Sequence, residues 1–306
     1  MMINVLQLCW LLTMAINQSS IIQSSGERGT HNKYDWKKEA KSKRLSAIKL
    51  REIASLTYQN ISKDQPTIVD QIGVANSNRV LELQGEREAL HKDSFLLIGY
   101  AIELLLKSAF LSLLIYAPKS LVEKNFETYG HRLRTIAETL SLELTETEFL
   151  LLEILGSYIV RETRYPVTSK SVEDYCSKTN SILAYVNDQN KFQLALSLYE
   201  KIEMFLAGID GTENNIKVHG RLNFGKDGYA IYRVGGKFPP VIVIRYSSKQ
   251  KQTKEDSPEY IRAIMKNYSD RGSCLNSRIF LNYWDKALVF KVVKDRKIVC
   301  ITPLPQ

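Results

Sequence analysis

The feature that most constrains this chain is an apolar run of 23 residues from Phe95 to Ala117 with only two charges, Glu103 and Lys107. Its length would suit a membrane-spanning helix, but each ionised group near its centre would cost about 2.5 to 3.5 kcal/mol in a bilayer. Glu103 and Lys107 stand four residues apart with the acid first, the favourable order for an ion pair on one helix face. A helix that is apolar on nearly all sides must be covered by neighbours. We therefore predict a buried helix at the centre of a bundle, with Glu103 and Lys107 as a structural or site-supporting pair.

Four more segments have the apolar spacing of helices. They span residues 131–140, 145–166, 169–186 and 191–207. Thr145 followed by Glu148 matches a capping box, and Gly208 is expected to end the last helix. Residues 118–130 are interpreted as a connector. Together these segments predict an antiparallel up-and-down bundle of four or five helices with short connections.

Beyond Gly208 the apolar spacing changes to alternation. We predict strands at residues 229–234, 241–246, 278–284, 287–293 and 297–302, and a short helix at 257–268. These elements predict a small α+β domain containing an antiparallel meander. The expected fold class is therefore α+β, a helical bundle followed by this domain.

Charge is distributed unevenly along the chain, which has a formal net charge of +9. Residues 211–306 hold 18 Lys and Arg against eight Asp and Glu, whereas residues 53–210 hold 15 against 21. We divide the chain into an apolar segment and linker (1–32), a basic helical extension (33–88), a bundle (89–210) and a basic α+β domain (211–306). The basic ends indicate contact with a polyanion, and a solvated lysine-rich surface is the alternative.

The aromatic residues of the last domain allow two interpretations. They either stack on nucleic-acid bases or form the core of the sheet. The residues in question are Tyr229, Tyr232, Tyr246, Tyr260, Tyr268, Tyr283 and Trp284.

The N-terminal segment and the cysteines bear on location. The apolar stretch from Val5 to Ile16 follows no Lys or Arg and is too short to span a bilayer. We interpret it as an N-terminal helix or an over-long start, and export or membrane association stays open. The four cysteines are far apart without zinc-ligand spacing, which favours a reducing, cytoplasmic setting without a metal site. No phosphate-loop, dinucleotide, GxSxG or HExxH pattern is present, so no cofactor is expected.

Three strings carry a family resemblance: YAIELLLKSAFL, YGHRLRTIAETL and YIVRETRYPV. Glu103, Lys107, the Gly130–His131 pair and the Arg164–Pro166 triplet occur in them in that order. This region, about residues 90–208, resembles the HEPN domain, a helical bundle of prokaryotic toxins, CRISPR-associated nucleases and nucleotidyltransferase-linked proteins. The resemblance implies a homodimer formed through the bundle and a defence or toxin–antitoxin setting.

The resemblance also implies candidate site residues. Active HEPN ribonucleases have an Arg followed four to six residues later by His, and neither Arg161 nor Arg164 is followed by such a His. His131 could supply the missing imidazole, because His is suited to proton transfer near neutral pH. Its alternative role is local hydrogen bonding at a helix start. Arg161, Arg164 and Tyr165 either bind an RNA phosphate or form a polar cluster that reaches Glu103.

Two functions remain open on the sequence. The first is a protein that binds RNA or a protein partner without catalysis, which the missing histidine favours. The second is a metal-independent endoribonuclease that uses a variant site of Arg161 and His131. Neither function calls for a membrane as a partner.

Overall fold

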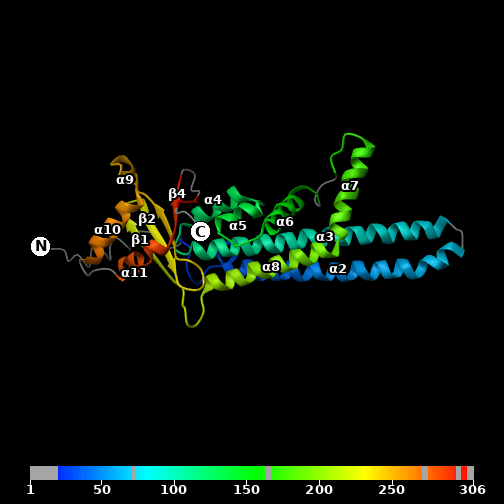
Figure 1. Cartoon of the computed structure of the whole chain (residues 1–306), viewed down its shortest axis with the longest axis horizontal. Coiled ribbons are helices and arrows are strands. Elements are labelled where there is room, and N and C mark those ends of the chain that lie inside the picture. Colours follow the sequence, from blue (N-terminus) through cyan, green and yellow to red (C-terminus); the bar gives the residue numbers. More distant parts are fainter. Residues whose placement is uncertain (1–19, 71–73, 163–166, 271–274, 294–297, 302–306) are drawn as a thin grey trace.

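The computed structural model describes residues 20–70, 74–162, 167–270, 275–293 and 298–301. A helical body lies along the long axis of the molecule and a five-stranded sheet lies at one end (Figure 1). The chain is therefore α+β, as the sequence predicts. The predicted helix within residues 1–19 lies outside the described residues.

A long helical hairpin is the axis of the molecule. After a short turn, η2 (Gly29–His31), the helix α2 (Lys33–Asp70) packs against α3 (Val74–Leu113) along its length. The predicted apolar helix is the second half of α3, which runs without a break through the division drawn between residues 88 and 89. By length and composition, Arg79–Leu113 is the one described helix that could cross a membrane, and 72% of its apolar window is buried inside the protein.

Shorter helices cover the hairpin. Three of them, α4 (Lys119–Tyr129), α5 (Leu133–Thr139) and α6 (Glu146–Ser157), lie on one side of α3, and α8 (Gln189–Asp210) packs along α3 beside α2 (Figure 1). A single π turn, η3 (Tyr158–Glu162), extends α6, and α7 (Val172–Asn187) projects from the body.

Two helix predictions need correction and one is confirmed. The predicted connector contains α4, because its Leu121, Val122 and Tyr129 bury one face of a helix. The helix α8 passes through Gly208 and ends at Asp210. The capping box is confirmed, since the Thr145 hydroxyl accepts a hydrogen bond from the Glu148 amide at 3.3 Å and the Glu148 carboxylate accepts one from the Thr145 amide at 2.7 Å.

The sheet contains β1 (Val218–Phe224), β2 (Gly228–Val234), β3 (Val241–Arg245), β4 (Leu288–Val292) and β5 (Ile298–Cys300) in that spatial order. The pairs β1–β2, β2–β3 and β4–β5 are antiparallel, but β3 and β4 are parallel. The predicted antiparallel meander is therefore wrong at this pair. Between β3 and β4 the chain forms α9 (Ser248–Gln252), α10 (Pro258–Asp270), α11 (Leu275–Tyr283) and η4 (Trp284–Lys286). The predicted helix at 257–268 corresponds to α10.

One predicted strand is a helix and one strand was not predicted. Residues 278–284 belong mostly to α11, whose Phe280 is fully buried against the outer face of the sheet. A short apolar run can be a helix or a strand, and here its burial on one side decides for the helix. The strand β1 carries half-exposed polar residues and lacks a clear alternation, which hid it in the sequence.

Each face of the sheet belongs to a different core. Ile231, Val243 and Phe290 join the core of the helical body, whereas Ala230 and Ile244 pack with α10 and α11. The inner face of the sheet is thus continuous with the bundle.

Buried aromatic residues resolve part of the base-stacking question. Tyr229, Tyr232 and Tyr246 are at most 3% exposed, so they form sheet core and offer no ring to a base. Tyr268 and Tyr283 are partly accessible at 42% and 38%.

Candidate functional site

A Glu–His pair links α3 to the turn between α4 and α5. Glu103 and Lys107 lie one turn apart on α3, and the Lys107 ammonium donates to Glu103 Oε1 at 2.5 Å. The other carboxylate oxygen, Oε2, accepts a hydrogen bond from His131 Nδ1 at 2.8 Å. The side chains of Glu103 and Lys107 are 7% and 11% exposed, whereas that of His131 is 38% exposed. The buried ion pair therefore supports an imidazole that reaches solvent.

The backbone around His131 is tightly constrained. Gly130 ends α4 with φ of +53°, a conformation that favours glycine, and His131 follows directly. Helix α6 approaches this turn so closely that a Cβ on Gly156 would lie 2.5 Å from the His131 carbonyl oxygen. The Gly156 backbone thus permits the contact that fixes the turn beside α3.

The hydrogen bond to Glu103 determines the chemistry of the ring. A carboxylate only accepts, so Nδ1 carries a proton and Nε2 is the nitrogen left to act as a base in the neutral ring. This arrangement is the one by which a carboxylate orients a general-base histidine. Within the described part of the chain, Nε2 has no hydrogen-bond partner.

His131 and Arg161 line the same cavity. A hollow of about 560 Å³ lies between α5 and α6, and its wall includes His131, Arg132, Arg134, Val160 and Arg161. Arg161 lies in η3, and its side chain is exposed. Among the described residues, no oxygen accepts a hydrogen bond from its guanidinium.

The other two arginines of the cavity have internal partners. Arg134 binds the carboxylates of Glu138, Glu146 and Glu153 at 2.8, 2.9 and 3.3 Å, and the hydrogen bond to Glu138, followed by that to Glu146, raises the pKa of its guanidinium. Arg132 donates to the carbonyl oxygens at the end of α4. Arg161 is thus the cation of this cavity that is left free by the described residues.

The outcomes for the predicted site residues differ. Glu103 and Lys107 form the predicted pair, and His131 joins Glu103 rather than only bonding locally. Among the described residues, no hydrogen bond joins Arg161 to Glu103, whose carboxylate accepts from Lys107 and His131 instead. Arg164 and Tyr165 lie outside the described residues. The contact between Glu103 and His131 was not predicted, since the two residues are 28 positions apart and no local pattern links them.

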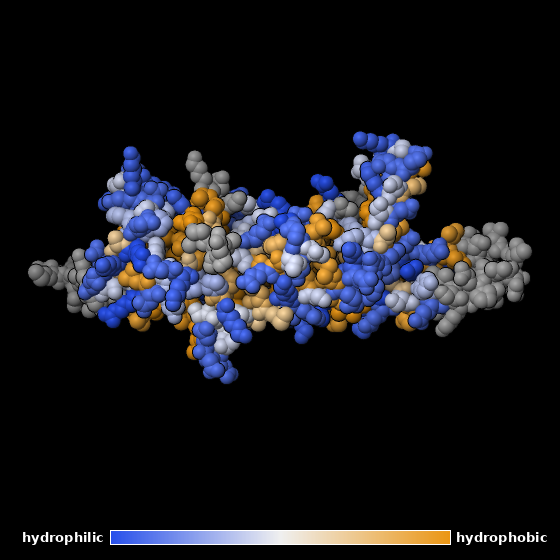
Figure 2. Space-filling view, in the orientation of Figure 1, coloured by the Kyte–Doolittle hydropathy of each residue, from blue (hydrophilic) through white to orange (hydrophobic). Residues whose placement is uncertain are grey.

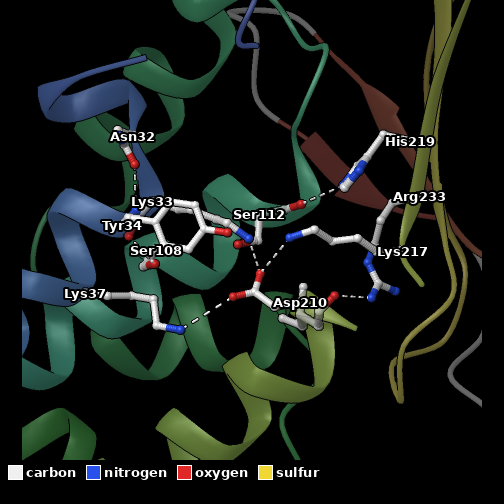
Figure 3. A network of polar contacts seen from close by, with 11 residues as sticks. Asn32, Lys33, Tyr34, Lys37, Ser108, Ser112, Asp210, Lys217, His219 and Arg233 are labelled. Atoms are coloured by element: carbon white, nitrogen blue, oxygen red, sulfur yellow. Dashed lines mark hydrogen bonds and ion pairs between the residues drawn. The ribbon is translucent and has the colours of Figure 1, made fainter. Parts of the chain in front are cut away.

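A second polar cluster joins the bundle to the sheet (Figure 3). The Asp210 carboxylate at the end of α8 accepts hydrogen bonds from Lys33, from Lys37 at 3.4 Å and from Lys217 at 3.3 Å. Burial lowers the pKa of the Lys33 ammonium to about 8. Burial by itself would raise the pKa of the Asp210 carboxyl. The hydrogen bond and charge of Lys33, together with the charges of Lys217 and Lys37, have the larger effect, so the pKa of Asp210 is lowered.

The same junction contains two further basic side chains of the sheet, Arg233 and His219. Arg233, fully buried on β2, donates to the carbonyl oxygens of Ile209 and Phe238. His219 on β1 donates from Nε2 to the Ser112 carbonyl oxygen at 3.2 Å, and burial lowers its pKa to about 4. These contacts hold the sheet on the ends of α3 and α8, so we interpret the cluster as an internal joint.

Comparison with protein-family models, with curated proteins and with solved structures gives no match. Within the described ranges, no group of three or more His, Cys, Asp or Glu is placed to hold a metal ion. The functional argument therefore depends on the geometry of the cavity.

Proposed function

We propose that this protein binds single-stranded RNA, with the His131–Arg161 cavity as the site that receives a phosphate and its ribose. The observation that carries the proposal is the shared cavity wall of Arg161 and a Glu103-bound His131. A free guanidinium suits a phosphate because its planar donors match the phosphate oxygens. The HEPN-like sequence of residues 90–208 supports the same choice of ligand and a homodimer formed through the bundle.

One observation favours a second candidate, a metal-independent endoribonuclease. Because Glu103 holds the Nδ1 proton of His131, Nε2 could take the proton of a ribose 2′-hydroxyl. The 2′ oxygen would then attack the adjacent phosphorus, and the 5′ oxygen of the next nucleotide would leave with a proton from water. Arg161 would stabilise the charge on the phosphate, and the product would carry a 2′,3′-cyclic phosphate.

The test is incubation of the full chain, in the presence of a chelator, with labelled single-stranded RNA. Wild type is compared with Arg161→Ala, His131→Gln and a control, Lys49→Ala, which removes an exposed cation on α2. Weaker retention in Arg161→Ala, without cleavage by any protein, is the expected result for a binding module.

Other outcomes decide between the candidates. Cleavage that leaves cyclic phosphate ends and is lost in both cavity variants would establish the ribonuclease. Wild-type protein that neither retains nor cleaves RNA would overturn both candidates and direct the search to a protein partner. Equal weakening by Lys49→Ala and Arg161→Ala would show that the cavity has no special role.

A further inference from the structure

Four lysines gather at the outer corner of the sheet. Lys226 lies in the turn between β1 and β2, Lys249 and Lys251 lie on α9, and Lys254 follows that helix. We call these four residues the α9 knob. All four side chains are exposed, and among the described residues none forms an ion pair. The surface over α9 is hydrophilic and stands out from the sheet (Figures 1 and 2).

The knob is held in place by polar contacts of its own. Asp227, next to Lys226, accepts hydrogen bonds from the Ser248 amide at 3.1 Å and from the Ser248 hydroxyl at 2.6 Å. A capping box between Ser247 and Gln250 fixes the start of α9. The two loops that carry the lysines are therefore tied together rather than free to separate.

Nearby acidic groups compensate only part of the charge of the four lysines, because Asp227 and Glu255 keep their negative charges and Asp256 is paired outside the knob. The carboxylate of Asp227 is engaged by Ser248, and that of Asp256 forms an ion pair with Lys291 at 3.5 Å. The Glu255 carboxylate accepts a hydrogen bond from the Thr253 hydroxyl at 2.7 Å. The knob therefore presents a local excess of positive charge.

The chemistry of the knob favours a phosphate backbone over a protein surface. Residues 225–254 include no exposed large apolar side chain, and a protein interface needs such an anchor at its centre. Lysine ammonium groups on flexible stems suit phosphate oxygens without reading sequence. The tyrosines of the adjacent strands are buried, so base stacking is not offered there.

We infer that the α9 knob binds the phosphate backbone of RNA as a second contact, separate from the His131–Arg161 cavity. This inference rests on the proposed RNA function and adds the element that supplies electrostatic affinity. Each phosphate neutralised on a single strand contributes about 0.7 to the slope of log affinity against log salt.

The experiment measures binding of labelled single-stranded RNA by fluorescence anisotropy over a salt series. It compares the full chain with Lys249→Gln/Lys251→Gln/Lys254→Gln and with a control of equal charge loss on α2, Lys38→Gln/Lys41→Gln/Lys49→Gln. The knob variant is expected to lose about 2 units of slope, while the control keeps the wild-type slope. These are surface substitutions, and circular dichroism checks that each variant is folded.

Every result bears on the inference. A wild-type slope in the knob variant, or an equal loss in both variants, would overturn the knob while leaving RNA binding intact. No RNA binding by wild type would overturn the proposed function as well. If wild type does not bind RNA but binds vesicles with anionic lipid through the α9 knob, the knob is a membrane contact and the inference is overturned.

Discussion

Lowering the pH from 7 to 5 should destabilise this protein through a buried histidine on α3. His91 is 5% exposed, and its Nδ1 accepts a hydrogen bond from the Arg51 guanidinium. Arg51 is itself buried between the rings of Phe95 and Phe192 and donates to the Val186 carbonyl oxygen at 2.5 Å. A proton on Nδ1 would remove the acceptor and place two cations together in the core.

The magnitude follows from the two pKa values of this imidazole. Burial, with the charges of Arg51 and Arg87, lowers the pKa of His91 from 6.5 to about 4 in the folded chain. Between these values only the unfolded chain takes up the proton, so stability is present above pH 6.5 and is lost as the pH falls toward 4. From pH 7 to pH 5 the loss amounts to about 2 kcal/mol for this one residue.

The assay is urea unfolding followed by circular dichroism at pH 7, 6 and 5. Wild type is compared with His91→Asn, whose amide oxygen stands at the Nδ1 position, can accept from Arg51 and does not titrate. Between pH 7 and pH 5 the free energy of unfolding of the variant should fall by about 2 kcal/mol less than that of wild type. The titration of carboxylates is common to both proteins and cancels in this comparison. His219→Gln should reduce the loss of free energy of unfolding by a similar amount, since the pKa of His219 is also lowered to about 4. Equal pH dependence of wild type and His91→Asn would refute the reasoning.

Two other substitutions test the packing around the proposed site and the joint. Gly156→Ala would place a Cβ 2.5 Å from the His131 carbonyl oxygen and should lower the free energy of unfolding in urea by about 1–3 kcal/mol. The control is Gly85→Ala, which has open space around the new Cβ and should raise the free energy of unfolding by up to about 1 kcal/mol. The reverse order would contradict the close contact between α6 and the turn. Asp210→Asn would leave three lysines without their carboxylate and should lower the free energy of unfolding by about 3 kcal/mol. The control, Glu52→Gln, breaks an exposed ion pair and should lower it by less than about 0.5 kcal/mol. Similar small losses in both variants would show that the joint does not depend on Asp210.

Local patterns were the part of the fold that the sequence could predict. The pair Glu103–Lys107 and the capping box Thr145–Glu148 each span one helical turn, so their spacing alone indicates the contact. The strands β2 and β3 were predicted from the apolar spacing beyond Gly208, and the structure buries nearly all of their residues. The parallel pairing of β3 and β4 could not be predicted from local patterns, because it depends on where the three intervening helices pack.

Long-range contacts made the rest of the site unpredictable. His131 reaches Glu103 only because the turn after α4 folds back on α3, and Gly156 allows that approach from a third helix. Asp210 meets Lys33 across 177 positions, and no sequence pattern joins them. These contacts are results of tertiary packing, so local propensity does not encode them.

The charges of the cavity and of the α9 knob imply a division of work in RNA binding. Around the cavity, Arg134 is surrounded by three carboxylates, so the wall has little net positive charge to attract a polyanion from a distance. The knob has the opposite character, because its lysines form no ion pair with the described residues and its buried polar groups, Ser247 and Gln250, bind each other in the capping box of α9. Arg161→Ala should therefore weaken binding with a slope change of about 0.7, one phosphate contact, whereas the knob variant should change it by about 2. If both variants changed the slope equally, the cavity and the knob would belong to one continuous electrostatic surface rather than to two sites with different roles.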